Sequence, residues 1–258
     1  MRLLFGLLSA AFFGTAPVAA SAVDMRFVYG DHDAYPYFAG TGQHIVEKPG
    51  MSVELSSVCA KTVGGNLSFS RLPVRRMHEE LRAAQVDMVI GLTYTAERAE
   101  YLAYPMRDGK PDASRRGATI SYMLYRLRGG KVAWDGKNIS GLEGPLGVNS
   151  GFALAGILRS RGVDVEEVQY DRQLFPMLER SRVGAVATLE NIGDYYIERT
   201  DSGAKIEKLE PALATGDYYI AASRHFYDTH SALVERFWNC LARERDRLYT
   251  SLAPKYLE

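Results

Sequence analysis

Short apolar segments alternate with helix-forming segments along this chain, and this alternation limits the folds that it can adopt. Three apolar segments near the N-terminus are predicted strands, over 25–30 (MRFVYG), 66–72 (NLSFSRL) and 86–90 (VDMVI). Apolar residues at helical spacing predict helices over 49–64 and from Pro73, whose missing N–H does no harm in a first turn. A strand–helix–strand–helix–strand order is typical of an α/β unit with a parallel sheet.

The same alternation repeats farther along the chain. Strands are predicted over 118–126, 145–149, 165–169 and 183–187, and helices over 152–161 and 171–181. Two similar α/β halves are therefore expected.

The segment 106–117 (MRDGKPDASRRG) lies between the two halves. It is rich in glycine, proline and charge, which suits a hinge or linker better than a core element. A second crossing between the halves is expected near 211–223 (PALATGDYYIAAS), and an amphipathic helix over 231–249 then closes the chain.

Residues 1–22 have the pattern of an export signal peptide. Arg2 is followed by an apolar run, and the small residues AASA at the end fit the cleavage rule. No later stretch approaches the roughly 18 uninterrupted apolar residues that a spanning helix needs. In a bacterium the destination of such a protein is the periplasm.

Composition excludes some classes of partner and chemistry. The 31 basic and 31 acidic residues balance, which argues against a nucleic acid or an anionic membrane held by bulk charge. The five histidines lack metal-ligand spacing, and Ser150 lacks the G-x-S-x-G nucleophile elbow. The DHD sequence at 31–33 allows a metal site, but a polar loop after a strand is the favoured interpretation. We expect no metal and no cofactor.

Cys59 and Cys240 are the two cysteines of the chain. An exported protein meets an oxidising compartment, where an even number of cysteines permits a disulfide. The alternative is two small buried apolar residues that never meet.

The sequence GLTYTAER, residues 91–98, follows the predicted strand over 86–90. Ligands of open α/β sheets bind beyond the carboxyl ends of strands, where this cluster lies. Gly91 permits a close approach of the backbone, the hydroxyl of Thr93 can donate, and Arg98 can hold a carboxylate with two parallel N–H bonds. The alternative is that Thr95 only caps a helix and Arg98 lies on its solvated face.

Four segments resemble known motifs in a fixed order. Residues 35–38 (YPYF) resemble Y-P-P-F, and residues 49–55 (PGMSVEL) resemble the helix start G-F-D-V-D-L. Residues 81–98 (LRAAQVDMVIGLTYTAER) resemble L-x-x-G-x-x-D followed by T-x-T-x-x-R, and residues 142–151 (LEGPLGVNSG) resemble L-x-G-x-x-V-G-V-x-x-G. These motifs belong to family 3 of the extracellular solute-binding proteins, which includes glutamine- and histidine-binding proteins.

The resemblance implies an α/β fold of the two-lobed periplasmic binding protein type II. Each lobe is expected to be a mixed sheet flanked by helices, and two crossing hinge strands join the lobes. Residues 24–108 with 218–258 are the expected first lobe, and residues 109–217 the second. Since Cys59 and Cys240 then lie on helices of one lobe, we predict that they form a disulfide.

The resemblance also implies the residues of a ligand site. Arg98 matches the arginine that takes an α-carboxylate, Thr93 the hydroxyl residue beside it, and Gly91 a backbone position of the same turn. The turn of the second lobe that presents backbone N–H groups falls on Ser150 and Gly151. Tyr35 falls near the aromatic residue that packs against the ligand, the alternative being a turn aromatic that covers the lobe.

One segment departs from the family pattern. Where amino-acid-binding members usually have GRVDAVVVD, whose last aspartate meets the ligand's ammonium group, this chain has SRVGAVATLEN, with Gly184 and Leu189 at the acidic positions. Glu190, one position later, can replace the aspartate expected at 189 only if the backbone shifts locally. The favoured interpretation is that Glu190 is a solvated glutamate at a helix start. Arg75 adds positive charge near the expected cleft, although a charged helix face is its commoner use.

The expected function is therefore capture of a small anionic, carboxylate-bearing ligand by a monomeric periplasmic protein, for uptake through an inner-membrane ABC permease. An amino acid is one candidate, but the missing acid at 189 favours a carboxylate without an ammonium group or a ligand with two acid groups. A dehydratase-like enzyme of the same fold, with Glu190 as its acid, and a sensory module that docks on a receptor are the alternatives.

Overall fold

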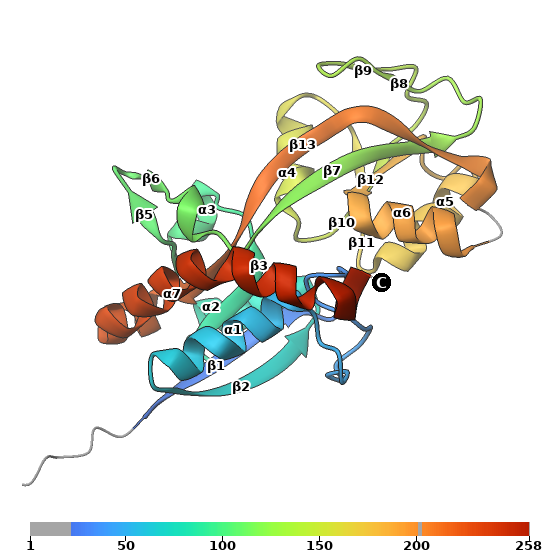
Figure 1. Cartoon of the computed structure of the whole chain (residues 1–258). Coiled ribbons are helices and arrows are strands. Elements are labelled where there is room, and N and C mark those ends of the chain that lie inside the picture. Colours follow the sequence, from blue (N-terminus) through green and yellow to red (C-terminus); the bar gives the residue numbers. More distant parts are fainter. Residues whose placement is uncertain (1–21, 201–202, 258) are drawn as a thin grey trace, which may run out of the picture.

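The first predicted series forms one end of a mixed sheet (Figure 1). The computed structural model describes residues 22–200 and 203–257. The elements of this series are β1 (Val23–Gly30), α1 (Met51–Thr62), β2 (Gly65–Leu72), α2 (Val74–Arg82), β3 (Met88–Leu92), α3 (Ala96–Ala99) and β4 (Leu102–Ala103). β1 lies between β2 and β3 and is parallel to both, as the strand–helix–strand order predicts.

The second predicted series forms the other end of the sheet. Its elements are β10 (Leu146–Asn149), α4 (Ala153–Ser160), β11 (Val165–Val168), the 3₁₀ helix η2 (Asp171–Gln173), α5 (Leu174–Glu179), β12 (Ala185–Leu189) and α6 (Glu190–Arg199). β10 lies between β11 and β12 and is parallel to both. The two halves are therefore similar in topology.

Two long antiparallel strands, β7 (Ala118–Leu127) and β13 (Ile206–Ser223), connect the two ends. β7 pairs with β12, and β13 pairs with β7 up to Tyr218 and with β3 from Tyr219. We call β1–β4, α1–α3 and the C-terminal helix α7 (Arg224–Leu257) the first part of the molecule, and β10–β12 with α4–α6 its second part.

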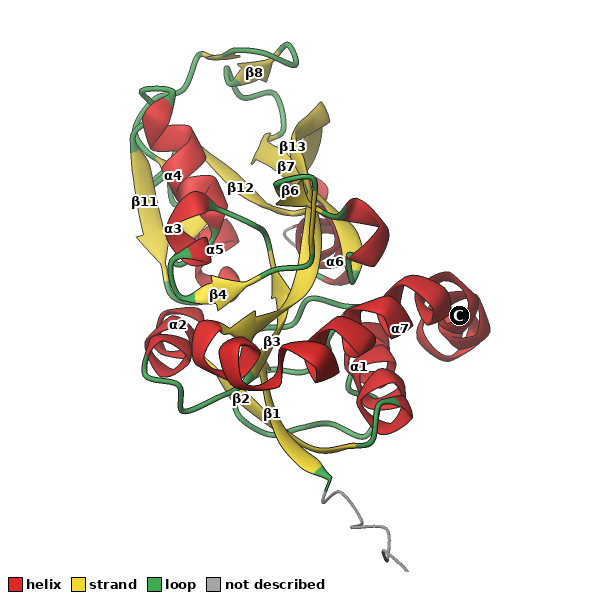
Figure 2. Ribbon diagram, turned by 90° about the vertical axis from the view of Figure 1, so that its left-hand side faces the viewer, coloured by secondary structure: helices red, strands yellow, loops and turns green. Residues whose placement is uncertain are grey.

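Helices cover both faces of the first part's strands (Figure 2). Alternate residues of β1 face opposite ways. The ring of Phe27 packs against Phe237 of α7, with centroids 5.7 Å apart, and Val28 packs with Met77 and Leu81 of α2. α1 and α7 therefore cover one face, and α2 covers the other.

Cys59 on α1 and Cys240 on α7 form a disulfide, with their Cα atoms 5.6 Å apart. Both residues are completely buried. The predicted pairing is confirmed, and it joins two helices of the first part that are 181 residues apart in sequence.

The segment predicted as a linker contains short structure of its own. β5 (Met106–Arg107) and β6 (Lys110–Pro111) form a hairpin, followed by the 3₁₀ helix η1 (Ala113–Arg115). A second small hairpin, β8 (Ala133–Trp134) with β9 (Ile139–Ser140), and the 3₁₀ helix η3 (Gly203–Lys205) complete the described elements.

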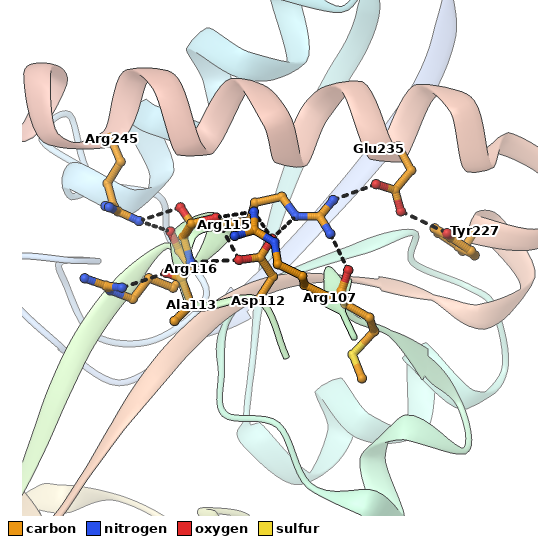
Figure 3. A network of polar contacts seen from close by, with 10 residues as sticks. Arg107, Asp112, Ala113, Arg115, Arg116, Tyr227, Glu235 and Arg245 are labelled. Atoms are coloured by element: carbon orange, nitrogen blue, oxygen red, sulfur yellow. Dashed lines mark hydrogen bonds and ion pairs between the residues drawn. The ribbon is translucent and has the colours of Figure 1, made fainter. Parts of the chain in front are cut away.

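A polar network ties this linker to α7 (Figure 3). Asp112 is buried; it accepts a hydrogen bond from Arg115 at 2.9 Å and forms an ion pair with Arg107, also at 2.9 Å. Arg115 also reaches Glu235 of α7 at 2.6 Å, and Arg245 of α7 donates to the Arg116 carbonyl oxygen at 2.9 Å. Although burial raises the pKa of Asp112, the Ser114 hydrogen bonds and the neighbouring arginines lower it overall. The segment is anchored to the first part.

Several element boundaries differ from the prediction. The predicted helix over 171–181 is split into η2 and α5, whereas α6 begins at Glu190, the expected helix start. α7 begins before the predicted helix over 231–249, but His230 has non-helical angles (φ −132°, ψ 31°), so a second helical stretch begins near the predicted start.

The predicted signal peptide, residues 1–22, lies outside the described residues except for Ala22. Within residues 22–200 and 203–257, no helix combines the length and the apolar character that crossing a membrane requires.

Candidate functional site

Arg98 lies where β3 ends, and it contacts both parts of the molecule. Thr95 caps α3, because its Oγ1 accepts from the backbone N–H of Arg98 at 3.1 Å. The Arg98 side chain is nevertheless only 7% exposed. Its Nη1 donates to the carbonyl oxygen and the hydroxyl of Thr93, both at 2.8 Å, and its Nη2 donates to the Gly151 carbonyl oxygen at 2.9 Å. The alternative prediction is therefore confirmed for the Thr95 cap, but its placement of Arg98 on a solvated helix face is wrong.

The space beside Arg98 is small. A cavity of about 20 Å³ remains there, room for roughly one water molecule. Aromatic rings occupy the rest of the surroundings, and burial raises the pKa of Tyr122 to about 12 and that of Tyr218 well above its usual value. These two phenols are neutral, and among the described residues no carboxylate forms an ion pair with the guanidinium of Arg98.

Two glycines permit this close packing. Gly91 has φ +86°, and a Cβ on it would lie 3.0 Å from the ring of Phe38. Gly151 has φ +83°, and a Cβ on it would lie 2.6 Å from Val74 Cγ1 of α2. Gly151 thus lets the second part approach the first, and it offers its carbonyl oxygen to Arg98. The backbone N–H of Ser150 donates to the Val168 carbonyl oxygen at 2.8 Å, so it serves strand pairing.

A larger cavity, of about 350 Å³, lies between the loop after β1 and the η2–α6 region of the second part. His32 lines both cavities. The larger cavity is also lined by three carboxylates, Asp31, Asp33 and Asp171, and by Tyr35. Tyr35 thus lies in the predicted region, and its hydroxyl donates to the Tyr256 carbonyl oxygen.

Two polar atoms of residues that line this cavity are buried without a hydrogen-bond partner among the described residues. They are Nε2 of His32 and Oδ2 of Asp171, whose Oδ1 accepts from the Thr188 hydroxyl at 3.2 Å. Burial lowers the pKa of His32, although Asp171 and Asp31 oppose this, so the ring is neutral near pH 7. Burial also raises the pKa of Asp33, which accepts from the Gly40 N–H at 2.9 Å.

Arg71 shapes the loop after β1, and the sequence analysis missed it. This fully buried guanidinium donates to the carbonyl oxygens of Gly30, His32, Gly40 and His44, at 2.6–3.2 Å. Because its donors are taken by the backbone, Arg71 holds the loop and is not available as an anion receptor. An arginine inside the predicted strand 66–72 was the signal that could have indicated it.

Three candidate residues, Ser150, Glu190 and Arg75, line neither of these two cavities. Glu190 forms an ion pair with Lys208 at 2.9 Å, and Arg75 is exposed on α2. Leu189 is completely buried at the end of β12. Asp171, which had no motif to identify it, brings a carboxylate to the end of β12, where its Oδ1 accepts from the Thr188 hydroxyl.

Among the described residues, no group of three or more His, Cys, Asp or Glu side chains is arranged to hold a metal ion.

The sequence matches no family model and no curated protein. Solved structures, in contrast, match along nearly the whole chain. One is an arginine third transport system periplasmic binding protein from Legionella pneumophila, with TM-score 0.70, 14% identity, and coverage of 89% of this chain and 99% of that one. A histidine kinase sensor domain similar to periplasmic binding proteins matches with TM-score 0.71 and 19% identity, covering 90% and 96%.

A third similar structure is an ancestral amino acid-binding protein described as a precursor of cyclohexadienyl dehydratase. Its TM-score is 0.65 at 15% identity, over 91% of this chain and 96% of that one. The chain therefore has the mixed α/β fold of amino-acid-binding proteins of ABC transporters. Transport, sensing and an ancestor of an enzyme all occur among its structural relatives, so the fold alone does not choose between them.

Proposed function

We propose that this chain is a periplasmic solute-binding protein that captures a small carboxylate-bearing ligand between two lobes. The first lobe comprises residues 24–108 with 218–258, and the second lobe comprises the expected stretch 109–217 without the linker 109–117, which is fixed to α7 of the first lobe. Residues 1–22 are the export signal. The observation that carries the proposal is the position of Arg98, a buried guanidinium at the boundary that reaches the backbone of Gly151.

A carboxylate is a better acceptor for Arg98 than the carbonyl group that it now meets. Hydrogen bonds between two charged groups are shorter and roughly twice as strong as neutral ones. An entering carboxylate would replace the Gly151 carbonyl oxygen, while the Thr93 hydroxyl stays beside it. Because the adjacent cavity holds only about 20 Å³, the lobes must open before this exchange.

β7 and β13 are the hinge strands of this mechanism. The linker before β7 is fixed to α7 by Asp112, Arg115 and Arg245, so bending falls beyond Gly117. Gly117 itself donates to the Tyr218 carbonyl oxygen at 2.7 Å, at the point where β13 leaves β7 for β3. Closure is therefore a hinge rotation about the short paired stretch of β7 and β13 next to Gly117 and Tyr218.

Uptake through an inner-membrane ABC permease is the role that we favour, and the similar transport-system protein supports it. Sensing is the second candidate, because a histidine kinase sensor domain has the same fold. An enzyme that uses Glu190 is disfavoured, since that carboxylate is paired with Lys208 and lines neither cavity.

A thermal-shift screen of amino acids, dicarboxylates and aromatic acids, run beside matched amines and amides that lack a carboxylate, tests the proposal, because a ligand that binds only the folded state raises the melting temperature. Small-angle scattering on the best ligand then reports compaction. A carboxylate that stabilises the protein and compacts it supports the proposal. Stabilisation only by compounds without a carboxylate overturns it.

A further inference from the structure

We infer that the larger cavity binds an organic cation, the guanidinium group at one end of the ligand, with Asp171 as its charge partner and His32 beside it. The inference rests on the proposed capture of a ligand between the lobes, and it names the chemistry of the ligand's second end. The larger cavity lies apart from the Arg98 contacts, and among the described residues His32 alone lines both cavities.

The charges around the cavity are predominantly negative. Asp31, Asp33 and Asp171 line it, against a single lining guanidinium, Arg172. That guanidinium lies over the ring of Tyr170, 4.7 Å from its centroid. A carboxylate ligand would be repelled here, whereas a cation would be attracted.

Unpartnered atoms indicate what the cavity lacks. Oδ2 of Asp171 and Nε2 of His32 are both buried, and neither has a partner among the described residues. A buried carboxylate oxygen without a donor is unfavourable, and native proteins usually supply one. An ammonium carries three N–H donors and a guanidinium five, while a neutral imidazole nitrogen can accept one of them. One cation therefore satisfies both orphaned groups.

The remaining walls suit the same ligand. Tyr35, Tyr170, Phe175, Tyr195 and Tyr196 line the cavity, and the faces of aromatic rings attract cations. The volume of about 350 Å³ falls in the small-ligand range of roughly 300–1,000 Å³.

Asp171 also takes the place of an absent acid. β12 ends at Leu189, which offers no charge, but the preceding Thr188 donates to Asp171 Oδ1 at 3.2 Å. The carboxylate at this strand end therefore comes from η2.

Three probes that differ by one group test the inference by isothermal titration calorimetry. Arginine carries a carboxylate and a guanidinium, citrulline replaces the guanidinium with a neutral urea group, and agmatine lacks the carboxylate. We expect wild-type protein to bind arginine and agmatine at least about tenfold more tightly than citrulline. Asp171→Asn should weaken agmatine binding by about 30-fold or more, the lower end of the loss for a buried charge pair. Asp164→Asn, an exposed aspartate on the same part, is the matched control and should leave binding unchanged.

The probes separate this inference from the proposed function. If wild-type protein binds citrulline as tightly as arginine, the cation site is overturned, whereas capture of a carboxylate by Arg98 is not. This comparison needs only the wild-type protein, so it holds even if Asp171→Asn fails to fold. Suppose that Asp171→Asn weakens agmatine binding but Arg98→Ala leaves arginine binding unchanged. This result supports the cation site and overturns the carboxylate role of Arg98. If wild-type protein binds neither arginine nor agmatine, the inference is overturned.

Discussion

Nη2 of Arg98 lies 2.9 Å from the carbonyl oxygen of Gly151, so a charged side chain of one part is bonded to the backbone of the other. This contact closes the molecule over its own candidate receptor. In the proposed mechanism a ligand must compete with Gly151 for the same guanidinium.

Arg98→Ala is predicted to weaken binding of the best carboxylate from the thermal-shift screen by about 2–5 kcal/mol, since a buried charge loses its partner. Arg98→Lys should restore only part of the affinity, because an ammonium cannot reproduce the planar two-bond contact. Thr93→Ala should cost about 1 kcal/mol. Calorimetry measures these changes, and Arg76→Ala, which removes an exposed ion pair with Glu80, is the control. Unchanged affinity in a folded Arg98→Ala protein would leave Arg98 with a structural role only.

Gly151→Ala is predicted to oppose closure. The new Cβ would lie 2.6 Å from Val74 Cγ1, in addition to the strain of φ +83°. Gly162→Ala is a matched control, because Gly162 has φ +76° but no atom within 4 Å of the new Cβ. Both changes carry roughly 1–2 kcal/mol of backbone strain. Scattering should therefore show a more open molecule for Gly151→Ala alone, and equal compaction of the two variants would contradict the prediction.

His78 is predicted to make stability fall in acid. Burial, with the charges of Arg98 and Arg82, lowers the pKa of His78 from 6.5 to about 4. Below pH 6.5 the unfolded chain binds a proton that the folded chain refuses, so this contribution is present at neutral pH and is lost as pH falls toward 4. The loss is roughly 3 kcal/mol. Urea unfolding at several pH values gives the free energy of unfolding as a function of pH. This free energy should fall less steeply with decreasing pH for His78→Gln than for the wild type, whereas the exposed control His225→Gln should keep the wild-type pH dependence. The same pH dependence for both variants would exclude His78 as the source.

Removal of the disulfide is predicted to cost stability without changing the fold. In the chain-entropy model, a bridge that closes a loop of 181 residues stabilises by about 5 kcal/mol. The double variant Cys59→Ser with Cys240→Ser should therefore unfold at a lower urea concentration. Addition of a reductant should shift the wild-type protein toward the variant and leave the variant unaffected. A variant as stable as the oxidised wild type would disprove this role.

The strands and helices that pack by periodicity could be predicted from the sequence. The β1–β3 and β10–β12 series follow from apolar runs and helical spacing, because burial repeats with the period of each element. The split of the predicted helix 171–181 was missed, since Pro176 lies within it and tertiary packing decides where the turn tightens. The pairing of Cys59 with Cys240 followed from placing both helices in one lobe.

The candidate site could be predicted only in part. Arg98 and Thr93 carried a local motif, and the structure brings their side chains together. Asp171 and Arg71 carried none, because what matters for them is contact with residues far away in sequence, such as Gly30 or the loop around His32. Local patterns cannot report which of several aspartates ends up buried without a partner.

The bridge between Cys59 and Cys240 also has a topological consequence. The disulfide closes residues 59–240 into a covalent loop, and both ends of this loop belong to the first part. The whole second part therefore lies within the loop. A protease that cuts the chain once anywhere between these cysteines yields two fragments that remain a single molecule until they are reduced. The second part is thus inserted between two points of the chain, α1 and α7, that the bridge keeps joined whatever happens to the chain between them.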